Sequence, residues 1–292
     1  MLNTTGSPTV VEEYYEDNTR RFLWFQKKSA AKSIHQGLWK ESYYTDKDAF
    51  NYSNQLILQE ILARKADTAM KIIDLGCGVG SSIFYLLGHY PSAEYYGVSI
   101  SKTQISIAQE QCKAQNLQKH VQFIAADFTK LPATLSDIDI AYSIEAFVHA
   151  PTPNQYLAAI SPKLKKGGKL ILIDDFLNDD FDWQQLDKKG KKAIKDFKYG
   201  WVANSLITRA TLQNIASNYN LKITEQTDLT PFMRNNTLKH KWIRFLVFTF
   251  RWCYQLFPWK SNYFRSWIGG VGKQYCLKKE IVKYQQFVLE KL

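Results

Sequence analysis

One nine-residue segment, I-I-D-L-G-C-G-V-G at Ile72–Gly80, constrains the fold of this chain more than any other. Its apolar start indicates a buried parallel strand. Gly76, Gly78 and Gly80 let the backbone turn sharply and approach a ligand where a Cβ atom would clash. A dinucleotide site needs G-x-G-x-x-G, whereas here the spacing is G-x-G-x-G and Asp74 places a carboxylate where a pyrophosphate would be repelled. The segment therefore predicts a site for a cationic, nucleoside-bearing ligand, with a plain tight turn as the alternative.

The same D-x-G-x-G-x-G pattern resembles the first motif of class I S-adenosylmethionine-dependent methyltransferases. In that family the glycine loop lies against the cofactor, and the acid serves the charged amino-acid end of S-adenosyl-L-methionine. The resemblance implies that Asp74, Gly76, Cys77 and Gly78 bind this cofactor.

The second predicted strand, Glu94–Ile100, comes about twenty residues later and precedes a helix that Ser101 can cap. Most class I methyltransferases end this strand with an acid that holds the ribose hydroxyls. This chain has V-S-I-S-K-T-Q instead, with Ser99, Ser101 and Gln104. That pattern is similar to the branch that contains sterol, tocopherol and cyclopropane-fatty-acid methyltransferases, and it implies that these neutral side chains contact the ribose.

A third strand, Val121–Asp127, ends in an acid followed by an aromatic residue. Asp127 and Phe128 resemble the adenine-binding pair of the family, in which the carboxylate meets the exocyclic amine and the ring lies beside the purine. A helix cap or turn is the alternative role for Asp127. Ser143, in the fourth strand Ile138–Ile144, completes the predicted set of cofactor-binding residues.

The segment after the fourth strand, I-E-A-F-V-H-A-P, closely resembles the I-E-A-x-x-H-A-P signature of sterol C-methyltransferases. Glu145 and His149 are four residues apart, so on a helical turn both would point along one face, toward the carboxyl ends of the strands. They are the predicted catalytic acid–base pair. The alternative is structural: His149 donates to a carbonyl group, and Glu145 anchors the loop or the cofactor.

Three further strands are predicted at Lys169–Phe176, after a Lys165–Gly168 turn, at Leu221–Leu229, and at Ile281–Leu289, the last antiparallel. The expected fold is α/β: a doubly wound, seven-stranded, Rossmann-like methyltransferase sheet with an N-terminal helical lid and a C-terminal helical insertion before the last strand. We divide the chain into a lid (1–45), a cofactor-binding core (46–230), a basic aromatic cap (231–280) and the final strand (281–292). Lys188–Lys192 is expected to be a solvated turn.

The net charge of +11 is concentrated near the C-terminus, where residues 231–292 hold 12 Lys and Arg but two acids. The same region carries 15 aromatic residues. Aromatic and basic side chains together favour an apolar, anionic ligand or a membrane interface. Such surfaces also stack bases, but without an RNA-binding motif we do not expect a nucleic-acid partner. Four cysteines without C-x-x-C spacing indicate neither a disulfide framework nor a metal site. With no leader and no apolar run of about 18 residues, we expect a cytoplasmic protein, with membrane association and homo-oligomerisation left open.

Residues outside the core are candidates for enclosing the acceptor. A Y-Y segment followed by I-H-x-G-x-W also precedes the first motif in terpenoid C-methyltransferases, which makes Tyr14, Tyr15, His35 and Trp39 lid candidates. Core packing is the alternative for Trp39. Arg234 and Arg244 are candidate contacts for an anionic group of the acceptor, or else surface cations.

The predicted reaction is methyl transfer from S-adenosyl-L-methionine to a small lipophilic acceptor. We favour C-methylation of an isoprenoid or prenyl diphosphate in terpenoid secondary metabolism, through a carbocation that a base then deprotonates. If the acceptor is a diphosphate, we expect Mg2+ to bind with it through the phosphate oxygens. O- or N-methylation of an aromatic natural product is the alternative, and a fold retained for membrane or nucleic-acid binding without catalysis is a second.

Overall fold

The computed structural model describes residues 10–13, 15–16, 19, 35–41, 44–64, 69–234, 238–256 and 262–292. Its labelled elements are, in chain order, α2 (Asp46–Ala63), β1 (Lys71–Leu75), α3 (Ser81–His89), β2 (Glu94–Ser99), α4 (Lys102–Ala114), β3 (Val121–Ala125), β4 (Ile138–Ile144), η1 (Phe147–His149), α5 (Pro153–Ile160), η2 (Ser161–Lys163), β5 (Leu164–Leu177), α6 (Lys188–Trp201), α7 (Arg209–Ser217), β6 (Leu221–Asp228), η3 (Thr230–Phe232), α8 (Leu238–Leu256), α9 (Asn262–Lys278) and β7 (Val282–Lys291).

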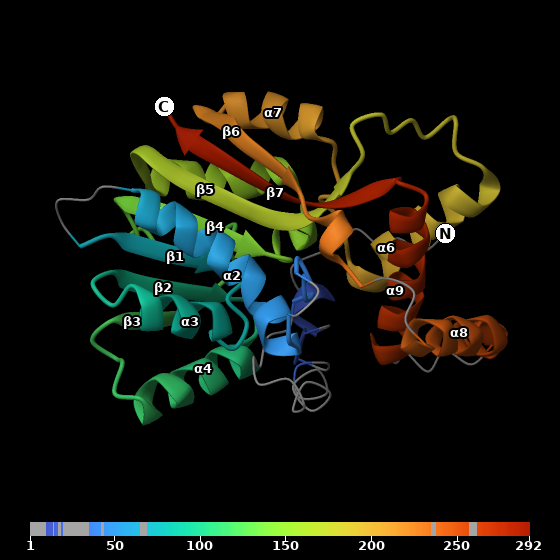
Figure 1. The fold of residues 1–292 in the computed structure, drawn as a ribbon, viewed down its shortest axis with the longest axis horizontal. Helices are drawn as coiled ribbons and strands as arrows, with labels where there is room; N and C mark the ends of the chain where they lie inside the picture. Colours follow the sequence, from blue (N-terminus) through green and yellow to red (C-terminus); the bar gives the residue numbers. More distant parts are fainter. Residues whose placement is uncertain are drawn as a thin grey trace.

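The strands form one seven-stranded sheet in the order β3-β2-β1-β4-β5-β7-β6 (Figure 1). β1 to β5 are parallel, and β7 runs antiparallel between β5 and β6. The chain builds outward from β1 in one direction, then returns to β4 and builds in the other. The doubly wound sheet with an antiparallel last strand is confirmed, and its switch point lies between β1 and β4, where sheets of this kind bind ligands.

Apolar side chains alternate between the two faces of the strands, and helices cover each face. In β1, Ile72 belongs to the apolar cluster that includes residues of α2, α3, α6 and α9, whereas Ile73 belongs to the cluster that includes residues of α5 and α7. Strands buried on both faces are expected for a parallel sheet between helical layers.

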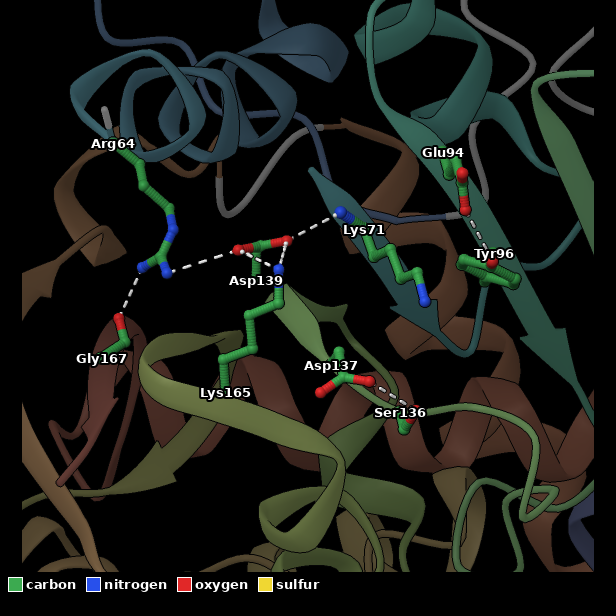
Figure 2. Close-up of polar contacts among 9 residues, drawn as sticks. All are labelled: Arg64, Lys71, Glu94, Tyr96, Ser136, Asp137, Asp139, Lys165 and Gly167. Atoms are coloured by element: carbon green, nitrogen blue, oxygen red, sulfur yellow. Dashed lines mark hydrogen bonds and ion pairs between the residues drawn. The ribbon is translucent and has the colours of Figure 1, made fainter. Parts of the chain in front are cut away.

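A buried carboxylate anchors the amino-terminal edge of the sheet (Figure 2). Asp139 in β4 pairs with Arg64 at 3.4 Å and with Lys165 at 3.0 Å, and it accepts a hydrogen bond from the Lys71 amide at 2.9 Å. These contacts join α2, β1, β4 and β5 at the edge opposite the glycine loop. β5 begins at Leu164, five residues before its predicted start at Lys169. The segment Lys165–Gly168, expected as a turn, is therefore part of the strand.

The C-terminal insertion consists of α8 and α9, and α9 lies tightly against α6. A Cβ atom at Gly200 of α6 would lie 2.2 Å from the backbone nitrogen of Gly269 in α9, so glycine permits this close approach. Figure 1 shows α6, α8 and α9 grouped at one side of the sheet. Lys188–Lys192, expected as a turn, instead starts α6, where Asp187 caps the helix by accepting from the Gly190 amide.

Candidate active site

The glycine loop lies between β2 and the segment that follows β4. The amides of Gly76 and Cys77 both donate to the Val98 carbonyl of β2, at 2.8 and 2.9 Å. Gly76, Gly78 and Gly80 all have positive φ angles, of 98°, 54° and 82°, which explains why glycine occupies these positions. A Cβ atom at Gly76 would lie 2.3 Å from the Ala146 Cβ atom. The loop backbone therefore lies directly against the start of the predicted catalytic segment.

Asp74 lies near the end of β1, below this loop, and is buried. Burial raises the pKa of its carboxyl group to about 7, although Tyr142 opposes the rise. A cation placed beside Asp74 would favour the ionised carboxylate. The position suits the ammonium group that the resemblance assigns to it.

Ser99, Ser101 and Gln104 form one buried hydrogen-bonded group at the end of β2. The Ser99 hydroxyl donates to Gln104 Oε1 at 2.8 Å, and the Ser101 hydroxyl accepts from the Gln104 amide at 3.1 Å, capping α4. Gln104 Nε2 donates to Thr19 at 3.1 Å. The three predicted ribose contacts are thus brought together, and their partner belongs to the N-terminal helical segment (residues 10–13, 15, 16 and 19).

Glu16 is a carboxylate that the sequence did not reveal at this place. It accepts hydrogen bonds from the Ser101 hydroxyl at 2.8 Å, from the Thr103 amide at 3.2 Å and from the Thr103 hydroxyl. Burial by itself raises the pKa of Glu16, but these hydrogen bonds outweigh it and leave the pKa below its usual value. The anion lies at the N-terminus of α4, where the helix dipole stabilises it. No local pattern in the sequence indicates which element such a helix contacts.

Asp127 and Phe128 follow β3 at the same edge of the sheet. One carboxylate oxygen of Asp127 accepts from both the amide and the hydroxyl of Thr129, each at 2.8 Å, so the residue does stabilise a turn. Its other oxygen, Oδ2, is buried and has no hydrogen-bond partner within the described residues. Phe128 lies with its ring edge-to-face on Tyr156, with 5.2 Å between ring centroids. Ser143 is fully buried in β4.

Glu145 departs from the helical turn that its spacing from His149 predicts. It has a positive φ of 52° and lies outside the short η1 helix. Its amide donates to the Ile173 carbonyl at 2.8 Å, and its Oε1 accepts from the Gln36 amide at 2.8 Å. Within the described residues no hydrogen bond or ion pair joins Glu145 to His149. The expectation of one shared helical face is therefore wrong, because the left-handed residue redirects the chain before η1.

His149 is buried in η1 and bonded on both ring nitrogens. Nδ1 lies 3.4 Å from the Val202 carbonyl, and Nε2 lies 2.9 Å from the Tyr15 hydroxyl. Since a carbonyl can only accept, we assign the proton to Nδ1, and Nε2 then accepts from Tyr15. Burial lowers the pKa of His149 to about 4, and Lys273 contributes to the lowering. The imidazole is therefore neutral at physiological pH, with its lone pair directed at the N-terminal helical segment.

The other candidate acceptor contacts are divided between the start of α2, the helix α8 and the residues outside the described ranges. His35 and Trp39 both pack on Phe50, and the Arg234 guanidinium lies 4.5 Å above the Trp39 ring. Burial lowers the pKa of His35 to about 4. Arg244 lies in α8. Tyr14 is outside the described residues.

Within the described part of the chain, none of the helices combines the length and apolar character that crossing a bilayer requires. In the same ranges, His, Cys, Asp and Glu side chains do not gather in threes in a metal-binding arrangement.

Comparison with known proteins confirms the resemblance read from the motifs. The methyltransferase domain family matches residues 66–237. This chain belongs to that family. It is accordingly recognised as a class I S-adenosylmethionine-dependent methyltransferase, as its glycine motif predicted.

Relatives of two reaction types are similar to this methyltransferase. Sterol 4-C-methyltransferase strm-1 of Caenorhabditis elegans is 26% identical over 54% of this chain and 46% of its own length. O-methyltransferase cnsE of Penicillium expansum is 29% identical over 58% and 59%. The matches thus span about half the length of these relatives. A structure of geranyl diphosphate C-methyltransferase from Streptomyces coelicolor A3(2), with Mg2+, geranyl-S-thiolodiphosphate and S-adenosyl-L-homocysteine, covers both chains fully, with a TM-score of 0.71 and 13% identity. At that identity the likeness concerns the fold.

Proposed function

We propose that this protein transfers a methyl group from S-adenosyl-L-methionine to a small lipophilic acceptor. The observation that carries the proposal is the arrangement of buried polar groups along the carboxyl edge of β1 to β4. Among the described residues, Asp74 has no cationic partner that shifts its pKa, and Asp127 keeps a buried oxygen without a hydrogen bond. Between them in the sheet order, the Gln104 side chain of α4 bonds to Ser99 at the end of β2. The three groups match, in order, the ammonium, adenine and ribose of the cofactor.

The proposed reaction is methylation at carbon of an isoprenoid acceptor. The π electron pair of an alkene attacks the methyl carbon, the C–S bond breaks, and sulfur keeps the electron pair. The resulting carbocation loses a proton from a neighbouring carbon to a base, which restores the alkene. The protein needs to align the two substrates and to exclude water. The sterol C-methyltransferase relative supports transfer to carbon, and the O-methyltransferase relative supports the alternative, transfer to the oxygen of a natural product.

We assign the proton acceptor to His149, with Glu145 as the second member of the predicted pair. His149 Nε2 carries a lone pair and already accepts a hydrogen bond from Tyr15. A hydroxyl group or a carbon-bound proton of the acceptor could use the same lone pair once Tyr15 gives way. Glu145 lies at the start of the same segment, but its carboxylate is engaged with the Gln36 amide. The geometry therefore favours His149 as base and Glu145 as an anchor for residues 35–41.

The α8 helix is the part of the insertion that we propose to contact a membrane. Trp242, Phe245 and Phe248 are exposed on it, Phe248 by 84%, and the helix contains basic residues but no acid. Apolar rings beside cationic side chains match an anionic lipid surface, from which a lipophilic acceptor can be taken up. Mg2+ enters the proposal only if the acceptor is a diphosphate, because the metal would then be bound through the phosphate oxygens.

The test uses full-length protein and a panel of isoprenoids, their diphosphates, sterols and phenols, each incubated with S-adenosyl-L-methionine. A mass gain of one methylene identifies the acceptor. With that acceptor, His149→Ala should lower the single-turnover rate by ~100- to 10,000-fold, while cofactor affinity stays near that of wild type. His120→Ala is the matched control, because His120 is exposed and follows α4, far along the chain from this segment.

Three outcomes count against the assignment. Absence of calorimetric binding of S-adenosyl-L-methionine refutes the proposed function. A wild-type rate in His149→Ala removes that residue as the base. If Glu145→Gln loses cofactor affinity and rate equally, Glu145 contributes to cofactor binding rather than to proton transfer.

A further inference from the structure

A buried polar cluster that the proposed chemistry does not use lies at the carboxyl end of β5. Asp175 of β5, Lys273 of α9 and Tyr284 of β7 are 1%, 2% and 0% exposed. Lys273 Nζ lies 2.7 Å from Asp175 Oδ2, and it also lies over the rings of Trp201 and Tyr284, 4.7 and 5.2 Å from their centroids. Asp175 and Tyr284 are direct neighbours across the β5–β7 ladder. The C-terminal insertion thus places a buried cation at the edge of the sheet that carries the proposed active site.

Each member of the cluster keeps a polar atom without a hydrogen-bond partner. Asp175 Oδ1 and the Tyr284 hydroxyl have none among the described residues, and Lys273 Nζ has none beyond its ion pair. A buried polar atom left unpaired destabilises the folded state, so such atoms are rare in folded proteins. Here an acceptor, a donor and a hydroxyl that can do both occur together. Together these atoms can form hydrogen bonds with a polar group from outside the chain.

The charges around the cluster select the kind of group. The carboxyl groups of Glu145, Asp174 and Asp175 all act on Lys273, and Lys273 in turn acts on Asp175. The same three carboxyl groups act on the Tyr284 hydroxyl, Glu145 first among them. Burial raises the pKa of Asp175 to about 6, although Lys273 opposes the rise. Burial by itself lowers the pKa of Lys273, but the carboxyl groups outweigh it and leave that pKa above its usual value.

A diphosphate does not match these surroundings, because it would bring at least two more negative charges to a group of three carboxyls and one ammonium. Like charges close together repel strongly where water is excluded. A neutral hydroxyl group does match. It can donate to Asp175 Oδ1 and accept from Lys273 or Tyr284, which pairs the free atoms without adding charge.

We propose that Asp175, Lys273 and Tyr284 bind the hydroxyl group of a neutral lipophilic alcohol, and that this alcohol is the methyl acceptor. The second half of this statement rests on the proposed methyl transfer, whereas the binding site does not. Within the isoprenoids, the site favours an alcohol over its diphosphate. Arg234 and Arg244, the predicted contacts for an anionic group, are not part of the cluster: Arg234 lies instead over Trp39.

The test measures binding to the full-length protein saturated with S-adenosyl-L-homocysteine, by calorimetry. The probes are linear isoprenoid alcohols of ten, fifteen and twenty carbons and their diphosphates. At least one alcohol should bind more tightly than its own diphosphate. Tyr284→Phe removes only the hydroxyl group and should lower the affinity for that alcohol about tenfold. Tyr219→Phe is the matched control, because the Tyr219 hydroxyl bonds to the Asn154 side chain on the other face of the sheet and should leave binding unchanged.

The charged pair is tested by removing both members at once, since a single substitution would leave a lone buried charge. The double variant Asp175→Asn with Lys273→Met should lower the affinity for the alcohol at least as much as Tyr284→Phe does. If the double variant does not fold, Tyr284→Phe decides the question alone.

The inference is overturned if the diphosphates bind more tightly throughout, if Tyr284→Phe binds the alcohol like the wild type, or if no alcohol binds. Methyl transfer to diphosphates alone would overturn the alcohol site and leave the proposed function intact. Conversely, an alcohol that binds through Tyr284 but is not methylated supports the site and overturns its assignment to the methyl acceptor, whereas only absence of S-adenosyl-L-methionine binding refutes the proposed function.

Discussion

Replacing Gly76 with alanine tests whether the glycine loop is built around its contact with the segment after β4. Two costs add. A side chain at a positive φ of 98° costs about 1–2 kcal/mol. The new Cβ atom would lie 2.3 Å from the Ala146 Cβ atom, and overpacking of this kind costs about 1–3 kcal/mol. We therefore expect Gly76→Ala to lower the free energy of unfolding by about 2–5 kcal/mol, a large part of the 5–15 kcal/mol typical of a domain.

A second substitution separates the two costs. In the double variant Gly76→Ala with Ala146→Gly, the clashing methyl group is gone but the positive φ remains. The double variant should recover about 1–3 kcal/mol relative to Gly76→Ala, the overpacking part. Gly88→Ala is the matched control: Gly88 lies in α3, where an added Cβ atom would point into open space, so alanine there should stabilise by about 0.4–1 kcal/mol.

The assay is urea unfolding of the wild type and the three variants, with the midpoint and the slope both fitted. An unchanged slope indicates that the shift in midpoint reports stability. The reasoning is refuted if Gly76→Ala is as stable as Gly88→Ala, or if adding Ala146→Gly recovers nothing.

Four further predictions concern the cofactor site, the lid and the surface. Because the pKa of Asp74 is raised to about 7, its carboxylate forms as pH rises through that value, so S-adenosyl-L-methionine should bind more tightly at pH 7.5 than at pH 6, and calorimetry with Asp74→Asn should show no such rise. The raised pKa also makes the stability of the apo protein depend on pH. The contribution of Asp74 to the free energy of unfolding is largest below the unfolded-state pKa of 3.8 and decreases as pH rises to 7. Over that range, the urea midpoint of apo wild type should therefore fall further than that of apo Asp74→Asn. Glu16→Ala should increase the rate of protease cleavage before residue 35 and lower the affinity for the cofactor severalfold. Equal cleavage rates in the variant and the wild type would contradict the role of Glu16 as an anchor. Vesicles with anionic lipid should sediment the wild type in low salt but not a variant with Trp242→Ser and Phe248→Ser, whereas equal sedimentation would exclude α8 as the contact.

The sequence is most informative where a signal is local. The glycine loop after β1 and the fourth strand, Ile138–Ile144, have the bounds that the sequence predicts, because strand length, glycine spacing and flanking polar residues are all contained in a few positions. The prediction of a turn at Lys188–Lys192 is wrong because a charge run has the same composition in a turn as in the first turns of a helix, and the decisive signal is the Asp187 cap that precedes it.

The candidate site is less predictable, because its contacts join distant parts of the chain. Spacing places Glu145 and His149 on one helical face, but a single left-handed residue separates them, and no rule of periodicity anticipates that. The contact of Tyr15 with His149 joins residues 134 positions apart. In the sequence, Lys273 is one cation among twelve near the C-terminus, and only the packing of α9 on α6 reveals that it is buried.

Tyr15 and Glu16 are neighbours in one helical segment, yet they bind different halves of the site. Tyr15 reaches the proposed base, and Glu16 holds the start of α4 beside the proposed ribose contacts. A helical segment moves as a unit, so breaking one contact loosens the other. We therefore expect exchange of spent cofactor and uncovering of the base to be coupled, and turnover to depend on the rate at which this segment detaches and returns.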